Sequence, residues 1–291
     1  MSVQHTAPID TTPVDATTAA RCERAEAWAW ADLYAAAPPA FAASAGIGCD
    51  EIDGALVLRW AATGRRYFSR AIGLGVRQPA TPGGIDRIIA GYERAGISMF
   101  LLAAQPHCEP AGYTSWLRER GLDPFDAHDR VVRGGEPAPP ARENANGAGR
   151  RSFTIERVTR DRAPEWDAFL QRVYHLDTGP WLPELVDRPG WHQYVAREDG
   201  ELVAARCMAI GPDGLAWLGM DGPVPGVHHD AYAPDAALCD HIVRDGLARG
   251  ARGFVTDIEA PSEALDTPAY RYFGELGFRR PYTRTHCARI A

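Results

Sequence analysis

The sequence predicts an α/β (α+β) protein whose chain holds two similar halves. Three observations predict this: short apolar runs alternate with amphipathic helical patterns, the order of elements repeats, and a segment rich in Gly, Pro and Asn separates the two copies. The most informative stretch is residues 215–260, which predict a strand, a loop, a helix and a second strand. The loop before such a helix is a common site for anionic ligands, because free N–H groups and the helix dipole converge there.

Composition and charge exclude several classes of function. Of the 291 residues, 45% are hydrophobic and 24% are charged, as in ordinary globular proteins. The formal net charge of −7 disfavours nucleic acid as a partner, and no apolar run is long enough to span a membrane. Six scattered cysteines form no C-x-x-C pair, so we expect reduced thiols in a cytoplasmic protein. Residues 1–20 lack the features of a secretory signal and predict a disordered tail.

The first half, residues 21–133, predicts an N-terminal domain that begins with a helix. Apolar runs predict its strands, and helical periodicities that end at prolines or glycines predict its helices. The strands are expected over residues 55–61, 69–76, 98–104 and 125–133, and the helices over residues 23–36, 85–95 and 112–120. Residues 134–150 have almost no large apolar side chain to bury and predict a linker.

The second half, residues 151–291, predicts a C-terminal domain with a longer series of strands. The dipeptide Asp199-Gly200 between two apolar strands is a hairpin signal. Strands are expected over residues 153–158, 191–197, 202–210, 215–220, 253–259 and 282–290, and helices over residues 164–173, 234–249 and 267–276.

Corresponding turns in the two halves are separated by nearly constant distances along the chain. The offsets are 146, 154 and 156 residues, for the pairs Gly75 and Asp221, Gly96 and Gly250, and Gly121 and Gly277. Nearly constant offsets favour duplication of one domain over coincidence.

From Phe153 onward the sequence resembles the GCN5-related N-acetyltransferase (GNAT) family. Residues 191–210 resemble the family's second and third strands, residues 215–222 its central fourth strand, and residues 233–250 the helix after its pyrophosphate loop. The turn Leu276-Gly277-Phe278 resembles the one that follows the family's closing helix, and the first half resembles a degenerate copy. The resemblance implies two GNAT-like domains, each a mixed, strongly twisted sheet flanked by helices.

The same resemblance implies transfer of an acetyl or acyl group from acyl-CoA to the amine of a small molecule, by a monomer or a homodimer. It assigns cofactor binding to the loop and to the start of the following helix. The positions are Val224, Val227, His228, His229, Ala233, Asp235 and Ala236.

That loop departs from the pattern of active members, which carry Arg/Gln-x-x-Gly-x-Gly/Ala so that backbone N–H groups can approach a pyrophosphate. Residues 227–236 contain no glycine and no arginine, and Asp230 and Asp235 add negative charge. Two alternatives stay open. The protein is either an acyltransferase with weak affinity for acetyl-CoA, or a GNAT-fold protein that has lost acetyl-CoA use and binds a ligand or catalyses another reaction in specialised metabolism.

The candidate catalytic residues are Asp221, Glu259 and Tyr272. Asp221 and Glu259 stand at strand ends, where ligands of open α/β sheets bind, and a carboxylate there can take a proton from an ammonium. Tyr272 lies next to the position of the family's general-acid tyrosine, which is Phe273 here. Each has a plainer alternative, as a turn residue, an exposed carboxylate and a core aromatic respectively. Tyr282 and Trp181 are candidate substrate contacts.

The tripeptide His228-His229-Asp230 contains residue types that bind metal ions. Adjacent histidines usually point apart, and the H-x-x-x-H spacing that places two ligands on one helix face is absent there. We therefore expect no metal site, and a polar loop or a ligand contact instead.

Overall fold

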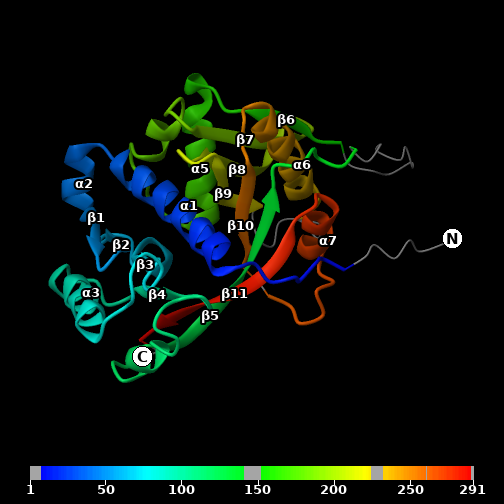
Figure 1. Ribbon diagram of the computed structural model, residues 1–291. Coiled ribbons are helices and arrows are strands. Elements are labelled where there is room, and N and C mark those ends of the chain that lie inside the picture. Colours follow the sequence, from blue (N-terminus) through cyan, green and yellow to red (C-terminus); the bar gives the residue numbers. More distant parts are fainter. Residues whose placement is uncertain (1–7, 141–151, 224–231, 260, 290–291) are drawn as a thin grey trace.

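A computed structural model describes residues 8–140, 152–223, 232–259 and 261–289. Over these residues one mixed sheet of eleven strands runs through the molecule in the order β1-β2-β3-β4-β11-β5-β10-β9-β8-β7-β6 (Figure 1). The strands of the first half are β1 (Ile47–Ile52), β2 (Ala55–Trp60), β3 (Arg70–Ile72), β4 (Leu101–Ala104) and β5 (Asp123–Gly134). Those of the second half are β6 (Thr154–Arg157), β7 (Trp191–Glu198), β8 (Glu201–Ile210), β9 (Leu215–Pro223), β10 (Gly253–Ile258) and β11 (Arg279–Ala288).

Helices cover both faces of the sheet. In the first half they are α1 (Ala16–Ala35), α2 (Pro39–Ala45), α3 (Pro82–Arg94) and α4 (Thr114–Arg118), with the short 3-10 helix η1 (Arg66–Phe68). In the second half they are α5 (Ala163–Tyr174), α6 (Tyr232–Ala248) and α7 (Pro268–Glu275), with η2 (Arg160–Arg162) and η3 (Leu182–Leu185).

Strand residues of the second half alternate between two cores, as the two-residue period of a strand requires. The core shared with α1 and α5 contains Val195, Cys207, Trp217 and Val255. The core shared with α6 and α7 contains the neighbouring residues Tyr194, Met208, Leu218 and Phe254. A third core lies in the first half, between α3 and the strands β2 to β4.

The two halves share strands rather than standing apart. β5 of the first half lies between β10 and β11 of the second, and β11 in turn pairs with both β4 and β5. Figure 1 shows β5 and β11 running side by side through the middle of the molecule. The proposed boundary at residues 134–150 therefore separates segments of one continuous sheet; Gly134 itself pairs with Gly253, and residues 141–150 lie outside the described part of the chain.

The predicted tail over residues 1–20 is wrong for residues 8–20. Asp15 caps α1, since its carboxylate accepts a hydrogen bond of 2.8 Å from the Thr18 N–H. Ile9 and Val14 are buried, and the N–H of Arg280 donates to the Asp10 carbonyl at 2.7 Å. Composition predicted a tail because these few apolar residues are spread among Thr, Asp and Pro.

One irregularity in the sheet positions the site described below. Ala205 pairs with Gly222 and Cys207 with Gly219, so Met220 and Asp221 together lie opposite the single residue Arg206. This is a β-bulge, and Met220 has the unusual φ of +48° for a residue with a side chain. β9 and β10 stop pairing before the bulge, since their parallel ladder ends at Trp217 and Val255.

Candidate functional site

A pocket of about 280 Å³ lies where β9 and β10 separate. Both halves of the chain line it. The first half contributes residues from α1, η1, β3 and β5, and the second half contributes the end of α5, the bulge of β9 and the end of β10. A pocket at the point where strands of a sheet diverge is a common position for a binding site.

The wall of the pocket combines aromatic rings with carboxylates. Its aromatic members are Trp30, Tyr67, Phe68, Tyr174 and Trp217. Its acidic members are Glu26, Asp221, Asp257 and Glu259, and its arginines are Arg65 and Arg70. Aromatic faces and carboxylates both attract cations, so this lining suits a positively charged molecule with apolar parts.

Asp221 lies at the bulge of β9, as predicted for the end of that strand. Its Oδ2 accepts a hydrogen bond of 2.8 Å from Nη2 of the buried Arg206. Burial raises the pKa of Asp221, and the ion pair with Arg206 opposes this rise. The backbone carbonyl of Asp221 accepts a further bond of 2.7 Å from the hydroxyl of Tyr174, which fixes the bulge against α5.

Glu259 also lines the pocket, directly after β10. Its side chain is exposed, yet the protein around its carboxyl and next the nearby Asp221 and Asp257 raise the pKa of Glu259 to about 7. A carboxyl group with such a pKa exchanges protons readily at neutral pH, which is the property of a general acid or base.

Asp235 stands in the first turn of α6, where the sequence resemblance led us to expect pyrophosphate binding, and its carboxylate already has partners. Arg206 donates to it through Nε and Nη2, both at 3.0 Å, and the hydroxyl of Tyr272 donates at 2.5 Å. The carboxylate thus places a negative charge at the positive end of the helix dipole. Of the other predicted cofactor contacts, Ala233 and Ala236 are half-buried on α6, while Val224, Val227, His228 and His229 lie outside the described residues.

Three predicted site residues do not line the pocket. Tyr272 is buried on α7 and its hydroxyl is occupied by Asp235, so the assignment as catalytic acid is corrected to a role in positioning that carboxylate. Trp181 is fully buried and donates through Nε1 to the Leu33 carbonyl at 2.7 Å. Tyr282 is buried and donates to Glu23 at 2.9 Å. Both substrate assignments are therefore corrected to packing, because these aromatic side chains fill the core between the halves.

Several pocket residues escaped prediction because they come from the first half. Trp30, Tyr67 and Arg70 were taken for ordinary members of a degenerate domain, although their side chains meet the second half at the pocket. His128 faces the pocket from β5. Burial lowers the pKa of His128 to about 3, with smaller contributions from the neighbouring His286 and Arg284, so its imidazole is neutral at neutral pH. In the sequence, the alternation of polar residues along residues 125–133 was the signal that could have pointed to His128.

Comparison with solved structures identifies the architecture. A GCN5-related N-acetyltransferase from Kribbella flavida superimposes with a TM-score of 0.61 at 15% identity, covering 92% of this chain and 94% of its own. A glucosamine N-acetyltransferase region of a fungal multi-domain GH3 β-N-acetylglucosaminidase gives a TM-score of 0.52 at 12% identity, covering 83% of this chain and 31% of its own. The chain has the GNAT fold. The resemblance predicted from the sequence is confirmed at this level, and the match extends over both halves.

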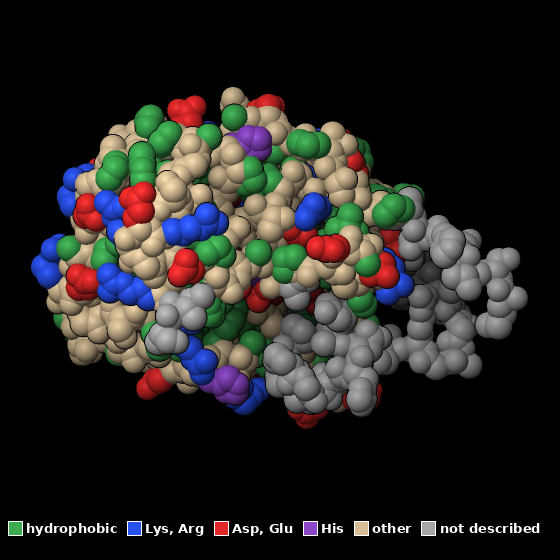
Figure 2. Space-filling model, turned by 90° about the horizontal axis from the view of Figure 1, so that it is seen from below, with side chains coloured by type: hydrophobic (Ala, Val, Ile, Leu, Met, Phe, Trp, Pro, Cys, Tyr) green, Lys and Arg blue, Asp and Glu red, His purple; other side chains and the backbone are tan. Residues whose placement is uncertain are grey.

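No protein-family model and no curated protein sequence matches this GNAT-fold chain. Among the described residues, no helix has the length and apolar character needed to cross a bilayer. Figure 2 shows acidic and basic side chains interspersed with hydrophobic ones over the face that it displays. A fold of this kind supports many functions, so the chemistry is argued from the pocket.

Proposed function

We propose that the protein is a GNAT-type N-acyltransferase that moves an acetyl or other acyl group from acyl-CoA to the amine of a small molecule. The observation that carries this proposal is the pocket between the diverging β9 and β10, with Asp221 and Glu259 on its wall. The GNAT fold supports it, since the structural neighbours are named as acetyltransferases and one of them as a glucosamine N-acetyltransferase.

The acceptor is a cationic amine of modest size. Five aromatic side chains line the pocket, and an ammonium group over an aromatic face gains about 0.5–2 kcal/mol, more where water is excluded. Glu26 and Asp257 are already ion-paired with arginines, which leaves Glu259 as the carboxyl group best placed to meet the substrate ammonium.

Glu259 removes the proton that the ammonium must lose before its nitrogen can attack. Its pKa of about 7 makes it a usable base at neutral pH and a weak one in acid. Asp221 is ion-paired with Arg206 at 2.8 Å, and because the same guanidinium also binds Asp235, the two carboxylates outnumber their arginine beside the incoming cation. An acyl thioester, when bound, supplies the activated carbonyl. The bulge at Met220 leaves backbone groups outside the strand pairing, and backbone N–H groups of this type stabilise an oxyanion.

The described residues suit the thioester end of acyl-CoA better than its diphosphate. The strand gap is open beside the bulge, whereas the first turn of α6 carries Asp235. An extra negative charge near a diphosphate costs on the order of 1 kcal/mol at a partly exposed site. Loss of charge-assisted hydrogen bonds from an arginine would cost roughly 1.5–3 kcal/mol each. We therefore expect acetyl-CoA to bind weakly, with a dissociation constant moved from micromolar towards millimolar.

The pair of Asp235 with Arg206 also favours a second candidate, a GNAT-fold protein that binds a cationic small molecule without using acyl-CoA. In that protein Asp235 would replace the bound phosphate as the anion at the start of α6.

Calorimetric titration of the full chain with acetyl-CoA and, separately, with a panel of small amines distinguishes the two candidates. The acyltransferase is expected to bind both and to release free coenzyme A only when an amine is present. Amine binding without any acetyl-CoA binding at millimolar concentration would favour the second candidate. Failure to bind any amine in the panel, together with no coenzyme A release, would contradict the proposal.

A further inference from the structure

Polar side chains form a stripe on one face of β5 and β11. Asp126 and His128 stand two residues apart on β5, so their side chains share a face. His286 is the direct cross-strand partner of Asp126, and Arg284 is the partner of His128. The register of this one antiparallel pair thus gathers an aspartate and two histidines that are up to 160 residues apart in sequence.

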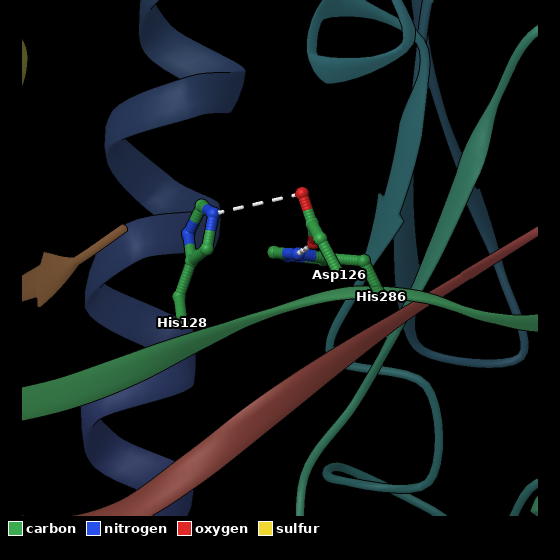
Figure 3. Close-up of side chains that lie close together, drawn as sticks. All are labelled: Asp126, His128 and His286. Atoms are coloured by element: carbon green, nitrogen blue, oxygen red, sulfur yellow. Dashed lines mark hydrogen bonds and ion pairs between the residues drawn. The ribbon is translucent and has the colours of Figure 1, made fainter. Parts of the chain in front are cut away.

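The three side chains point toward one another, as Figure 3 shows. One ligand atom from each can be chosen so that all lie within 4.8 Å of one another. Nδ1 of His286 is 2.7 Å from Oδ1 of Asp126, and Nε2 of His128 is 3.9 Å from Oδ2 of Asp126. The hydroxyl of Tyr67 donates to Asp126 and lies 2.6 Å from Nε2 of His128. This hydroxyl oxygen is a fourth polar atom in the group.

Two features show that ordinary hydrogen bonding leaves this group incomplete. Nε2 of His286 is buried and has no hydrogen-bond partner, one of fourteen such side-chain atoms among the described residues, and it is the one that lies on a ring of this group. Asp126 forms no ion pair with an arginine in the described chain, whereas the neighbouring Glu26 and Asp257 do. A buried imidazole nitrogen and a carboxylate without a cation together point to a missing positive partner.

From this geometry we infer that Asp126, His128 and His286 form a binding site for a divalent transition-metal ion of the zinc class, with Tyr67 beside it. Two imidazoles and one carboxylate are the donors that Zn²⁺ and its neighbours in the first transition row prefer. Donors around one tetrahedral Zn²⁺ at about 2.0–2.2 Å lie about 3.3–3.6 Å from one another. The side chains would therefore need to rearrange by roughly 1 Å, and the hydrogen bond of 2.7 Å between Nδ1 of His286 and Oδ1 of Asp126 would have to open.

The surrounding charges permit a cation there. The guanidinium groups of Arg70 and Arg284 are nearby, but Arg70 is paired with Glu26 at 2.9 Å and Arg284 with Asp257 at 2.7 Å. Because His128 and Tyr67 also line the pocket, a metal ion at this site would lie at the pocket wall and keep a coordination position for water or a small ligand. Metal binding by these residues needs no acyl-CoA chemistry.

The test is metal binding by the full-length protein after dialysis against a chelator. Titration with Co²⁺, followed by visible absorption, is expected to show a single saturating equivalent with the spectrum of nitrogen and oxygen ligands, which Zn²⁺ displaces. His128→Gln and His286→Gln are each expected to weaken binding by at least about 100-fold, judging from the 10–100-fold effect of losing even an outer partner. A wild-type chain that binds no Co²⁺ or Zn²⁺ would overturn the inference at once.

Matched controls locate the ion. His192→Gln changes a half-buried histidine on β7, and the double variant His228→Ala/His229→Ala removes the adjacent pair; both are expected to keep wild-type affinity. Loss of binding in the double variant, or retention in both His128→Gln and His286→Gln, would place the ion elsewhere and overturn the inference. Far-UV circular dichroism checks that each variant folds, and His128→Gln carries the test alone if the fully buried His286 does not tolerate replacement.

Discussion

At the scale of single residues, the proposed acyl transfer depends on the protonation of Glu259. Its pKa of about 7 lies well above that of an ordinary glutamate, so the group changes charge within the physiological range. Only the deprotonated form accepts a proton. A rate that needs this form rises about tenfold per pH unit below pH 7 and levels off above it.

We therefore predict that Glu259→Gln lowers kcat/KM by about 10²–10⁴-fold and removes the rise through pH 7. Initial rates of amine-dependent coenzyme A release between pH 5.5 and pH 8.5 measure both effects. Glu263→Gln, at an exposed carboxylate four residues further on, is the control and should keep the wild-type profile. An unchanged pH profile in Glu259→Gln would mean that another group takes the proton.

At the scale of elements, α1 is the helix that ties the halves together. Asp32 near its end accepts hydrogen bonds of 2.6 and 2.7 Å from Arg188 and one of 2.8 Å from Nε1 of Trp191. Burial opposes ionisation of Asp32, but the bonds from Arg188 and Trp191 outweigh it and lower the pKa of this carboxyl. A bidentate, partly buried pair of this kind contributes more than an exposed one.

Asp32→Asn is expected to lower the free energy of unfolding by about 1–3 kcal/mol, because it removes the charge from these bonds. The folded-state pKa of Asp32 is depressed, so its contribution is fully present above the unfolded value of about 4 and is lost as the pH falls through the folded value. Urea unfolding at pH 7 and at pH 3 measures this: the difference between wild type and variant should shrink at pH 3. A difference that stays the same at both pH values would argue against a role for the charge.

The sequence predicts elements well where the signal is local. The strands over 191–197, 202–210 and 253–259 and the helix over 234–249 are confirmed within a few residues, because periodicity and turn residues define them. α2 and β1 were missed, since Pro39–Ala45 is short and Ile47–Ile52 lacks a regular alternation of apolar and polar residues. Pairing between distant strands has no local signal, and therefore neither the shared sheet nor the grouping of Asp126 with His286 could be predicted.

The same distinction holds for the site. Asp221 and Glu259 were predicted at strand ends, which are visible in a sequence, and both line the pocket, while their catalytic roles stay predictions. Trp181 and Tyr282 were wrong because an aromatic residue that binds a ligand and one that fills a core look alike until their burial is known.

At the scale of the whole molecule, buried charges lie where the halves meet. Glu26 of α1 pairs with Arg70 and Arg130 of the first half and with Arg284 of the second. Burial opposes ionisation of Glu26, but these three arginines hold its pKa well below the usual range. A buried network of ion pairs contributes little net stability when all partners are present. Removing one partner lowers the free energy of unfolding by about 3–5 kcal/mol, because it leaves a buried charge uncompensated. Separating the halves would leave several such charges without partners.

Cleavage of the chain between the halves is therefore expected to leave one particle. If a specific protease site is introduced within residues 141–150, a segment that composition predicts to be a linker, the cut should occur readily and give two fragments on a denaturing gel. On a native sizing column the fragments should elute together at the volume of the intact protein, because β5 pairs with β10 and β11 across the cut. Residues 151–291 expressed alone should aggregate, since β10 and β11 would expose edges that β4 and β5 cover in the intact chain. Two fragments that separate in native buffer, each compact and with cooperative unfolding, would show that the halves are independent domains and that the shared sheet contributes little to their folding.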